Sequence, residues 1–444
     1  MDALCARLGV DSSPAILAAA LSVGLMRNPE RLGARALGTK IVVLPLIALA
    51  AGLVGLAIVV VPALGASLFA GSIALSIWLR NFGERATAAG RTIALPFIAI
   101  LVAPLRPDAA HGRWTSALLL LAAGAAALVS TTIVAGLAAR FGMAPEPRPA
   151  RLARPRPVRA GELPVATRMA LQMLVALGLA FAIGMLAFRA HWSWVVLTAF
   201  IVCSGAAGRG DVFYKGLLRL GGAIGGTLAA ALVAQIAFPD PVAYAAAVFF
   251  VLFLGLWLRP LNYAYWAACA TLIFALLQGS HGAAIVPLFA MRVLCMFIGA
   301  LCGVAATWFV CPIRTEHVVR RRIAGVLAAL RDVLAGTPEG PAHESRLAVL
   351  ERHAAELKLV EPPVRLHRAV FGAKRPDEDP ATWIDLTHAL LAQARTPGFD
   401  RTHLGAEMRR LRGMLQFDTL PSGSKKSASK ASAPKQGHSE APEC

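Results

Sequence analysis

Two adjacent apolar segments between His191 and Phe238 constrain the fold more than any other part of the sequence. A short polar turn separates them, and both approach the roughly 20 residues that a helix needs to cross the hydrocarbon core of a bilayer. The second segment carries Gly222 and Gly226, a four-residue spacing that lets transmembrane helices approach each other closely. These features predict an all-α protein whose helices pack inside a membrane.

The composition favours the same class. Hydrophobic residues make up 57% of the chain and charged residues 16%, and the mean hydropathy is +0.63, values typical of a multi-span membrane protein. The net charge of +19 comes from basic residues in loops between apolar runs, where the positive-inside rule places them, so we expect no nucleic-acid partner. The seven cysteines form no CxxC pair, so we expect no metal site, no disulfide framework and no cofactor.

Apolar runs predict about eleven transmembrane helices in two halves, five in the first half and six in the second. The expected spans of the first half are about 13–26, 36–55, 58–79, 90–104 and 115–138. Those of the second half are about 165–188, 191–206, 216–238, 241–258, 262–279 and 287–311. The fold expected is therefore polytopic.

Changes of composition divide the chain into five parts. We expect a first membrane half at 1–138, a Pro- and Arg-rich cytoplasmic linker at 139–164 and a second membrane half at 165–312. A cytoplasmic region of helices is expected at 313–420, because apolar residues recur there at helical spacing. The basic, low-complexity tail at 421–444 has the composition of a disordered segment.

Basic residues and a repeat predict the topology. Most Lys and Arg residues of the short loops fall on the side of the linker, which places the C-terminus in the cytoplasm and the N-terminus outside. RLGARALGT, beginning at Arg31, is similar to RLGGAIGGT, beginning at Arg219, and both start spans that leave the cytoplasm. Because matching segments share a direction, the halves should be related by an axis along the membrane normal. Gly38 and Gly226 would then occupy matching packing positions.

Several stretches of the second half together carry a family resemblance. They are HWSWVVLTAFIV, RLGGAIGGTLAAAL, NYAYWAACATLIFALL and RVLCMFIGALCGVAATWFV. These stretches resemble the membrane unit of the fusaric acid resistance and aromatic acid exporter family, over about 165–330 and in weaker form over 13–138. The resemblance implies a multi-pass transporter of the bacterial inner membrane, driven by the proton-motive force, that exports aromatic carboxylic acids.

The resemblance also implies partners. The substrate would be a small organic anion and the surroundings membrane lipid, and some members of the family work with a periplasmic adaptor protein. We also expect a homo-oligomer.

The candidate substrate pathway combines positive charge with aromatic side chains. An anion entering a low-dielectric region needs a positive group nearby, and two arginines lie in or beside apolar runs of the second half. The pathway hypothesis includes Arg219, Arg292, Trp192, Trp194, Tyr263 and Trp266. The alternative interpretation is that the arginines extend to the phosphate layer as anchors and that the aromatic residues form interfacial belts.

Proton coupling and helix packing involve other residues. No Asp or Glu falls in the middle of an expected span, so coupling would depend on His191 or His281, or on a substrate that carries its own proton as a weak acid. Small residues at four-residue spacing mark the expected helix contacts. These packing glycines are Gly38, Gly222, Gly226, Gly299 and Gly303.

Three functional classes fit the sequence. The first is a transporter that exports small organic anions. The second is a passive anion channel, because plant malate channels resemble the same family and no acidic residue lies within a span to couple protons. The third is a membrane-anchored interaction protein that acts through residues 313–420. An enzyme is not expected, because the sequence has no nucleophile elbow and no metal-ligand cluster.

Overall fold

The computed structural model describes residues 34–102, 163–233, 241–279, 285–336, 341–372, 378–394 and 401–416, with a few single positions between these ranges. Every element within these ranges is helical. The chain divides into two units, Met1–Ile313 and Arg314–Cys444, and each is described by itself. The division falls beside the boundary that the sequence places after residue 312.

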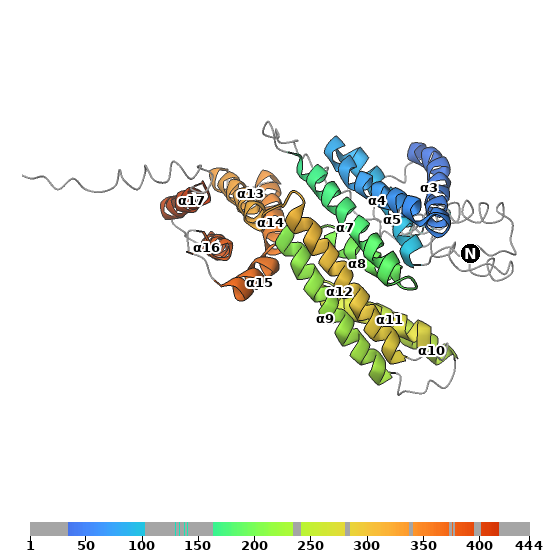
Figure 1. Ribbon diagram of the computed structural model, residues 1–444. Helices are drawn as coiled ribbons and strands as arrows, with labels where there is room; N and C mark the ends of the chain where they lie inside the picture. Colours follow the sequence, from blue (N-terminus) through green and yellow to red (C-terminus); the bar gives the residue numbers. More distant parts are fainter. Residues whose placement is uncertain are drawn as a thin grey trace, which may run out of the picture. The chain divides into compact units, whose positions relative to one another are not determined.

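The first unit is a bundle of apolar helices (Figure 1). Its early helices are α3 (Ala34–Val60), α4 (Pro62–Trp78), the short 3₁₀ helix η2 (Leu79–Phe82) and α5 (Glu84–Val102). Its later helices are α7 (Val165–Ala187), α8 (Trp192–Cys203), α9 (Arg209–Val233), α10 (Pro241–Leu258), α11 (Tyr263–Gly279) and α12 (Ile285–Phe309).

Four helices in the described part are long and apolar enough to cross a membrane: Pro62–Phe82, Val165–Ala187, Arg209–Val233 and Ala290–Phe309. Shorter apolar helices include Trp192–Cys203. The expected spans at 13–26 and 115–138 lie almost wholly outside the described residues. The total of eleven spans and the relation between two halves therefore stay predictions, whereas the all-helical architecture holds for the described residues.

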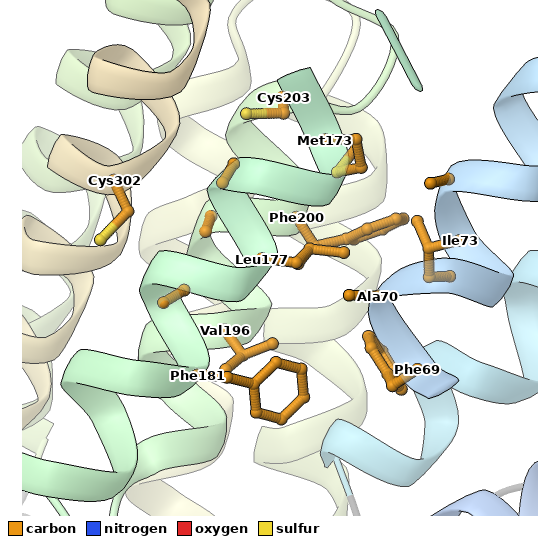
Figure 2. Close-up of a cluster of buried hydrophobic side chains, with 14 of the residues drawn as sticks. Phe69, Ala70, Ile73, Met173, Leu177, Phe181, Val196, Phe200, Cys203 and Cys302 are labelled. Carbon is orange, nitrogen blue, oxygen red and sulfur yellow. The ribbon is translucent and has the colours of Figure 1, made fainter. Parts of the chain in front are cut away.

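The core of the first unit lies where α4, α7 and α8 meet (Figure 2). Phe69 of α4 packs edge-on against Phe181 of α7, with ring centroids 5.5 Å apart. Helix α8 is buried on more than one side, since Val195, Val196 and Val202 all have no exposed surface. A helix that is apolar all round belongs in the interior of a bundle. At 12 residues it is only about 18 Å long, shorter than the roughly 30 Å hydrocarbon core.

The turn from α8 to α9 fixes where α9 begins. Gly205 has a φ of 66°, a left-handed conformation that glycine adopts without a steric penalty. Asp211 accepts a hydrogen bond from the backbone nitrogen of Ala207 at 2.9 Å and pairs with Lys215 at 3.1 Å. The backbone nitrogen of Arg209 donates to the carbonyl oxygen of Ile313 at 3.2 Å. The start of α9 therefore lies beside the end of α12, and the two helices run antiparallel.

The second unit has its own core. Its helices are α13 (Thr315–Ala335), α14 (Pro341–Lys358), α15 (Glu361–Phe371), α16 (Pro380–Gln393) and α17 (Arg401–Gln416). Trp383 of α16 has no exposed surface, and the guanidinium of Arg320 lies 4.9 Å from the centre of its ring. Asp379 caps α16 by accepting a hydrogen bond from the backbone nitrogen of Ala381 at 3.1 Å, which satisfies one of the free amides at the helix start.

Candidate anion-binding site

Arg219 is a buried cation between three helices. It lies on α9 with 9% of its surface exposed. Its Nε donates to the hydroxyl of Thr198 on α8 at 3.4 Å, and its Nη1 donates to the hydroxyl of Tyr263 on α11 at 3.2 Å. Both acceptors are neutral, so the hydrogen bonds hold the guanidinium in place without neutralising its charge. Each hydroxyl keeps its own proton for another acceptor.

Arg292 is a second buried cation, on α12, with 5% of its surface exposed. Its guanidinium carbon lies 5.2 Å from the centre of the Trp194 ring on α8. A cation over the face of an indole ring is attracted by the negative potential of that face. Trp194 and Thr198 are four residues apart on α8 and so share one side of that helix. One side of α8 therefore contacts both arginines.

The register between α9 and α12 brings the two arginines close together. A Cβ added at Gly216 of α9 would lie 3.5 Å from the Cβ of Ala300 on α12. Arg219 lies three residues after Gly216 on α9, and Arg292 lies eight residues before Ala300 on α12. Because the helices run antiparallel, both arginines lie on the same side of that contact. About 8 Å therefore separates them along the helix axes. The guanidinium groups are near enough to repel each other.

The one acidic residue of these helices, Asp211, pairs with Lys215 in the first turns of α9. Between Val212 and Phe309 the sequence contains one acidic residue, Asp240, which lies between α9 and α10. Moving one cation to the centre of a bilayer costs about 3 kcal/mol on insertion scales, and the repulsion between two adds to that cost. An anion placed between the arginines would offset both terms.

Four of the six predicted pathway residues contribute to this site: Arg219, Arg292, Trp194 and Tyr263. The other two make different contacts. Trp192 stacks on Phe181 of α7, with ring centroids 5.5 Å apart, and Trp266 lies under the guanidinium of Arg259 at 5.8 Å. Both contacts serve helix packing in the structure.

Thr198 is a site residue that the sequence analysis missed. It is a polar residue with 1% exposure inside the otherwise apolar WSWVVLTAFIVC helix. A buried hydroxyl needs a hydrogen-bond partner, so its position one turn beyond Trp194 was a signal that could have placed it at the site.

Of the two histidines predicted to couple protons, the structure describes one. His191 precedes α8, and its ring lies 4.7 Å from that of Trp194, so it borders the site. His281 lies outside the described residues. The role of either residue in coupling stays a prediction.

The predicted packing glycines explain how the helices come so close. A Cβ added at Gly226 would lie 2.4 Å from the carbonyl oxygen of Ala268 on α11. One added at Gly299 would lie 2.3 Å from the carbonyl oxygen of Val195 on α8. Gly222 faces α11 in the same way, and Gly303 faces α8 less closely, since a Cβ placed there would lie 3.0 Å from the Sγ of Cys203. The surroundings of Gly38, on α3, lie outside the described part.

Comparison with known proteins bears on the same helices. Residues 174–306 match the family model described as fusaric acid resistance protein-like. This segment is fusaric acid resistance protein-like. The resemblance expected from the sequence is thereby confirmed, and the match extends from within α7 to within α12. No match was found among curated proteins or among solved structures.

The family and the structure together define the class of the protein. The fusaric acid resistance protein-like segment contains Thr198, Arg219, Tyr263 and Arg292, so the whole site lies inside it. The family is one of membrane transporters rather than enzymes. With apolar helices of membrane length, the chain is an integral membrane protein.

Proposed function

We propose that this protein exports small organic anions, chiefly aromatic carboxylates, across a bacterial inner membrane. The observation that carries the proposal is the pair of buried arginines, Arg219 and Arg292, held near each other by helices whose one acidic residue, Asp211, already pairs with Lys215. An anion is the ligand whose charge such a pair stabilises most.

The groups around the arginines suit a carboxylate. Arg219 is fixed by the hydroxyls of Thr198 and Tyr263, which are free to donate their protons to a bound oxygen atom. Arginine binds carboxylates through parallel N–H donors, in bonds roughly twice as strong as neutral ones. Trp194, beside Arg292, supplies an aromatic surface on which a substrate ring can pack. These five side chains therefore match a ring that bears a carboxylate.

The direction and surroundings of transport belong to the same proposal. The anion would leave the cytoplasm past Arg219 and be released past Arg292, with the C-terminus in the cytoplasm. A periplasmic adaptor protein and a homo-oligomeric state complete this picture. The basis for these points is the distribution of Lys and Arg along the chain and the family resemblance.

A passive anion channel is the second candidate. The observation that favours it is the absence of Asp and Glu from residues 212–239 and 241–309, because carriers driven by protons usually bury a carboxylate. A carrier can still be proton-driven when its substrate is a weak acid. The two candidates predict different results for flux against a gradient.

Flux through proteoliposomes tests the proposal. The full chain is reconstituted with 4-hydroxybenzoate on one side, and movement of the compound is followed with and without an imposed pH gradient. We expect saturable flux, absent from empty liposomes, that accumulates 4-hydroxybenzoate beyond its equilibrium distribution when the gradient is present. Flux that only equilibrates would indicate a channel. No protein-dependent flux of this or any other aromatic acid would contradict the proposal.

A truncated chain separates the third class of function from the first two. If the protein acts only through residues 313–420, ending the chain at Pro312 should remove its activity in cells. We expect the truncated protein, where it inserts normally, to retain 4-hydroxybenzoate flux, because Arg219, Arg292 and their contacts all precede that residue.

A further inference from the structure

A cavity with a partly polar lining lies in the first unit, and neither arginine of the pair lines it. Its volume is about 50 Å³, room for roughly three or four water molecules or for a small acid of similar bulk. It is found where α4 and α12 end and where α7 and α9 begin. Its apolar wall includes Ile73, Met173 and Phe200, which belong to the core in Figure 2.

The polar lining of the cavity has one cationic group and no anionic one. Arg80 of η2, an exposed residue, lies at its edge, together with Ser76, Gln172, Ser204 and Thr307 in the lining. No Asp or Glu lines the cavity, and among the described residues Arg80 forms no ion pair. Arg91, a neighbouring cation, adds to the positive potential at Arg80. The cavity therefore favours a negatively charged ligand.

Gln172 contributes a hydrogen-bond acceptor whose direction is fixed. Its Nε2 donates to the carbonyl oxygens of Val310 at 3.0 Å and Cys311 at 3.1 Å. Both amide protons of Gln172 are thus used, and its Oε1 points away from these two carbonyl groups. The residue is 94% buried, since 6% of its surface is exposed, and Oε1 accepts no hydrogen bond from a described residue. Oε1 is therefore open to a donor in the cavity, from water or from a ligand.

The hydroxyls around Gln172 are mostly committed as donors. Ser76 donates to the carbonyl oxygen of Ile73 at 2.7 Å, and Thr307 donates to the carbonyl oxygens of Gly303 and Val304 at 3.0 and 2.9 Å. Their oxygens present lone pairs. Apart from Arg80 and Ser204, the polar lining thus accepts hydrogen bonds rather than donating them, so a ligand with both a hydroxyl donor and a negative charge complements it.

We propose that this cavity binds small hydroxycarboxylates, with Arg80 on the carboxylate and the Oε1 of Gln172 accepting from the hydroxyl. The site is distinct from the Arg219 and Arg292 pair and does not depend on the export proposed above. Glycolate is the simplest ligand that meets both requirements and has the size of the cavity. Acetate is its matched control, because it differs from glycolate only by the missing hydroxyl.

Equilibrium dialysis of radiolabelled glycolate and acetate against the full purified chain tests this inference. We expect glycolate to bind about five- to tenfold more tightly than acetate, as one added hydrogen bond predicts. Gln172→Leu should remove that preference while leaving acetate affinity within about twofold. Arg80→Gln should weaken binding of both acids about two- to fivefold, as expected for an ion pair at an exposed arginine.

Two control variants locate the effect. Arg91→Gln removes the same charge on a residue outside the lining and should leave the preference for glycolate unchanged. Arg292→Gln removes carboxylate binding at the arginine pair, and the preference for glycolate should persist in this variant, which separates the cavity from that pair. Equal affinity for glycolate and acetate, or binding that Arg292→Gln abolishes and Arg80→Gln does not, would overturn the inference. The Arg80→Gln result keeps the test decisive even if Gln172→Leu does not fold.

Discussion

Replacing Gly226 by leucine should prevent the first unit from folding, whereas replacing Gly225 by leucine should leave it intact. A Cβ at position 226 would lie 2.4 Å from the carbonyl oxygen of Ala268 and 2.8 Å from the Cβ of Thr271. Backbone atoms of α11 cannot move aside unless α9 and α11 separate. We expect a loss of about 3 kcal/mol or more, at the upper end of overpacking effects.

Gly225 is the matched control for this substitution. It is the neighbouring residue on α9, and a Cβ built there meets nothing within 4 Å. Both variants have the same composition, so differences in expression or hydropathy cancel. The measurement is the melting temperature and the size-exclusion profile of the two purified proteins in one detergent. A Gly226→Leu protein as stable as the Gly225→Leu protein would show that α9 and α11 do not pack in this way.

Removing either buried arginine should greatly reduce anion transport. Arg219→Gln and Arg292→Gln retain hydrogen-bonding capacity and comparable bulk but lose the charge that attracts a carboxylate. Losing one charge-assisted hydrogen bond should weaken substrate binding about ten- to a hundredfold, which appears as a rise in the half-saturating concentration of 4-hydroxybenzoate. The substitutions relieve the repulsion between the arginines but also remove the contacts of Arg219 with Thr198 and Tyr263 and of Arg292 with Trp194, so insertion and melting temperature are measured beside transport.

Arg259→Gln provides the control for charge. Arg259 lies at the end of α10, exposed to solvent and over the ring of Trp266, away from the Thr198 and Tyr263 hydroxyls. The substitution removes one positive charge from the protein and should leave transport of 4-hydroxybenzoate nearly unchanged. If all three variants transport alike and insert normally, Arg219 and Arg292 are anchors and not part of a pathway.

Hydropathy located several helices well because each is long and apolar. The run expected at 165–188 corresponds to α7, Val165–Ala187, and the run at 262–279 to α11, Tyr263–Gly279. Helix ends that lie in polar sequence were predicted less accurately. Helix α9 begins at Arg209, ahead of the expected 216, because Asp211 joins its first turn to Ala207 and Lys215. Apolar runs alone cannot show that a helix continues into charged residues.

The site was predictable as a set of residues but not as an arrangement. Arg219 and Arg292 stand out as cations in apolar surroundings, yet their proximity depends on the register that places Gly216 opposite Ala300. Register between helices far apart in the chain follows from tertiary packing, which one sequence does not reveal. Gln172 was missed for the same reason, since its carbonyl partners lie about 140 positions away.

The position of a bound anion tests the central claim most directly. A structure of the full chain with 4-iodobenzoate would locate the ligand by its heavy atom. We predict that its carboxylate lies between Arg219 and Arg292, within about 3 Å of guanidinium nitrogens and of the Tyr263 hydroxyl, with its ring near Trp194. An iodobenzoate bound elsewhere in the first unit, with the two arginines facing only protein or lipid groups, would contradict the account.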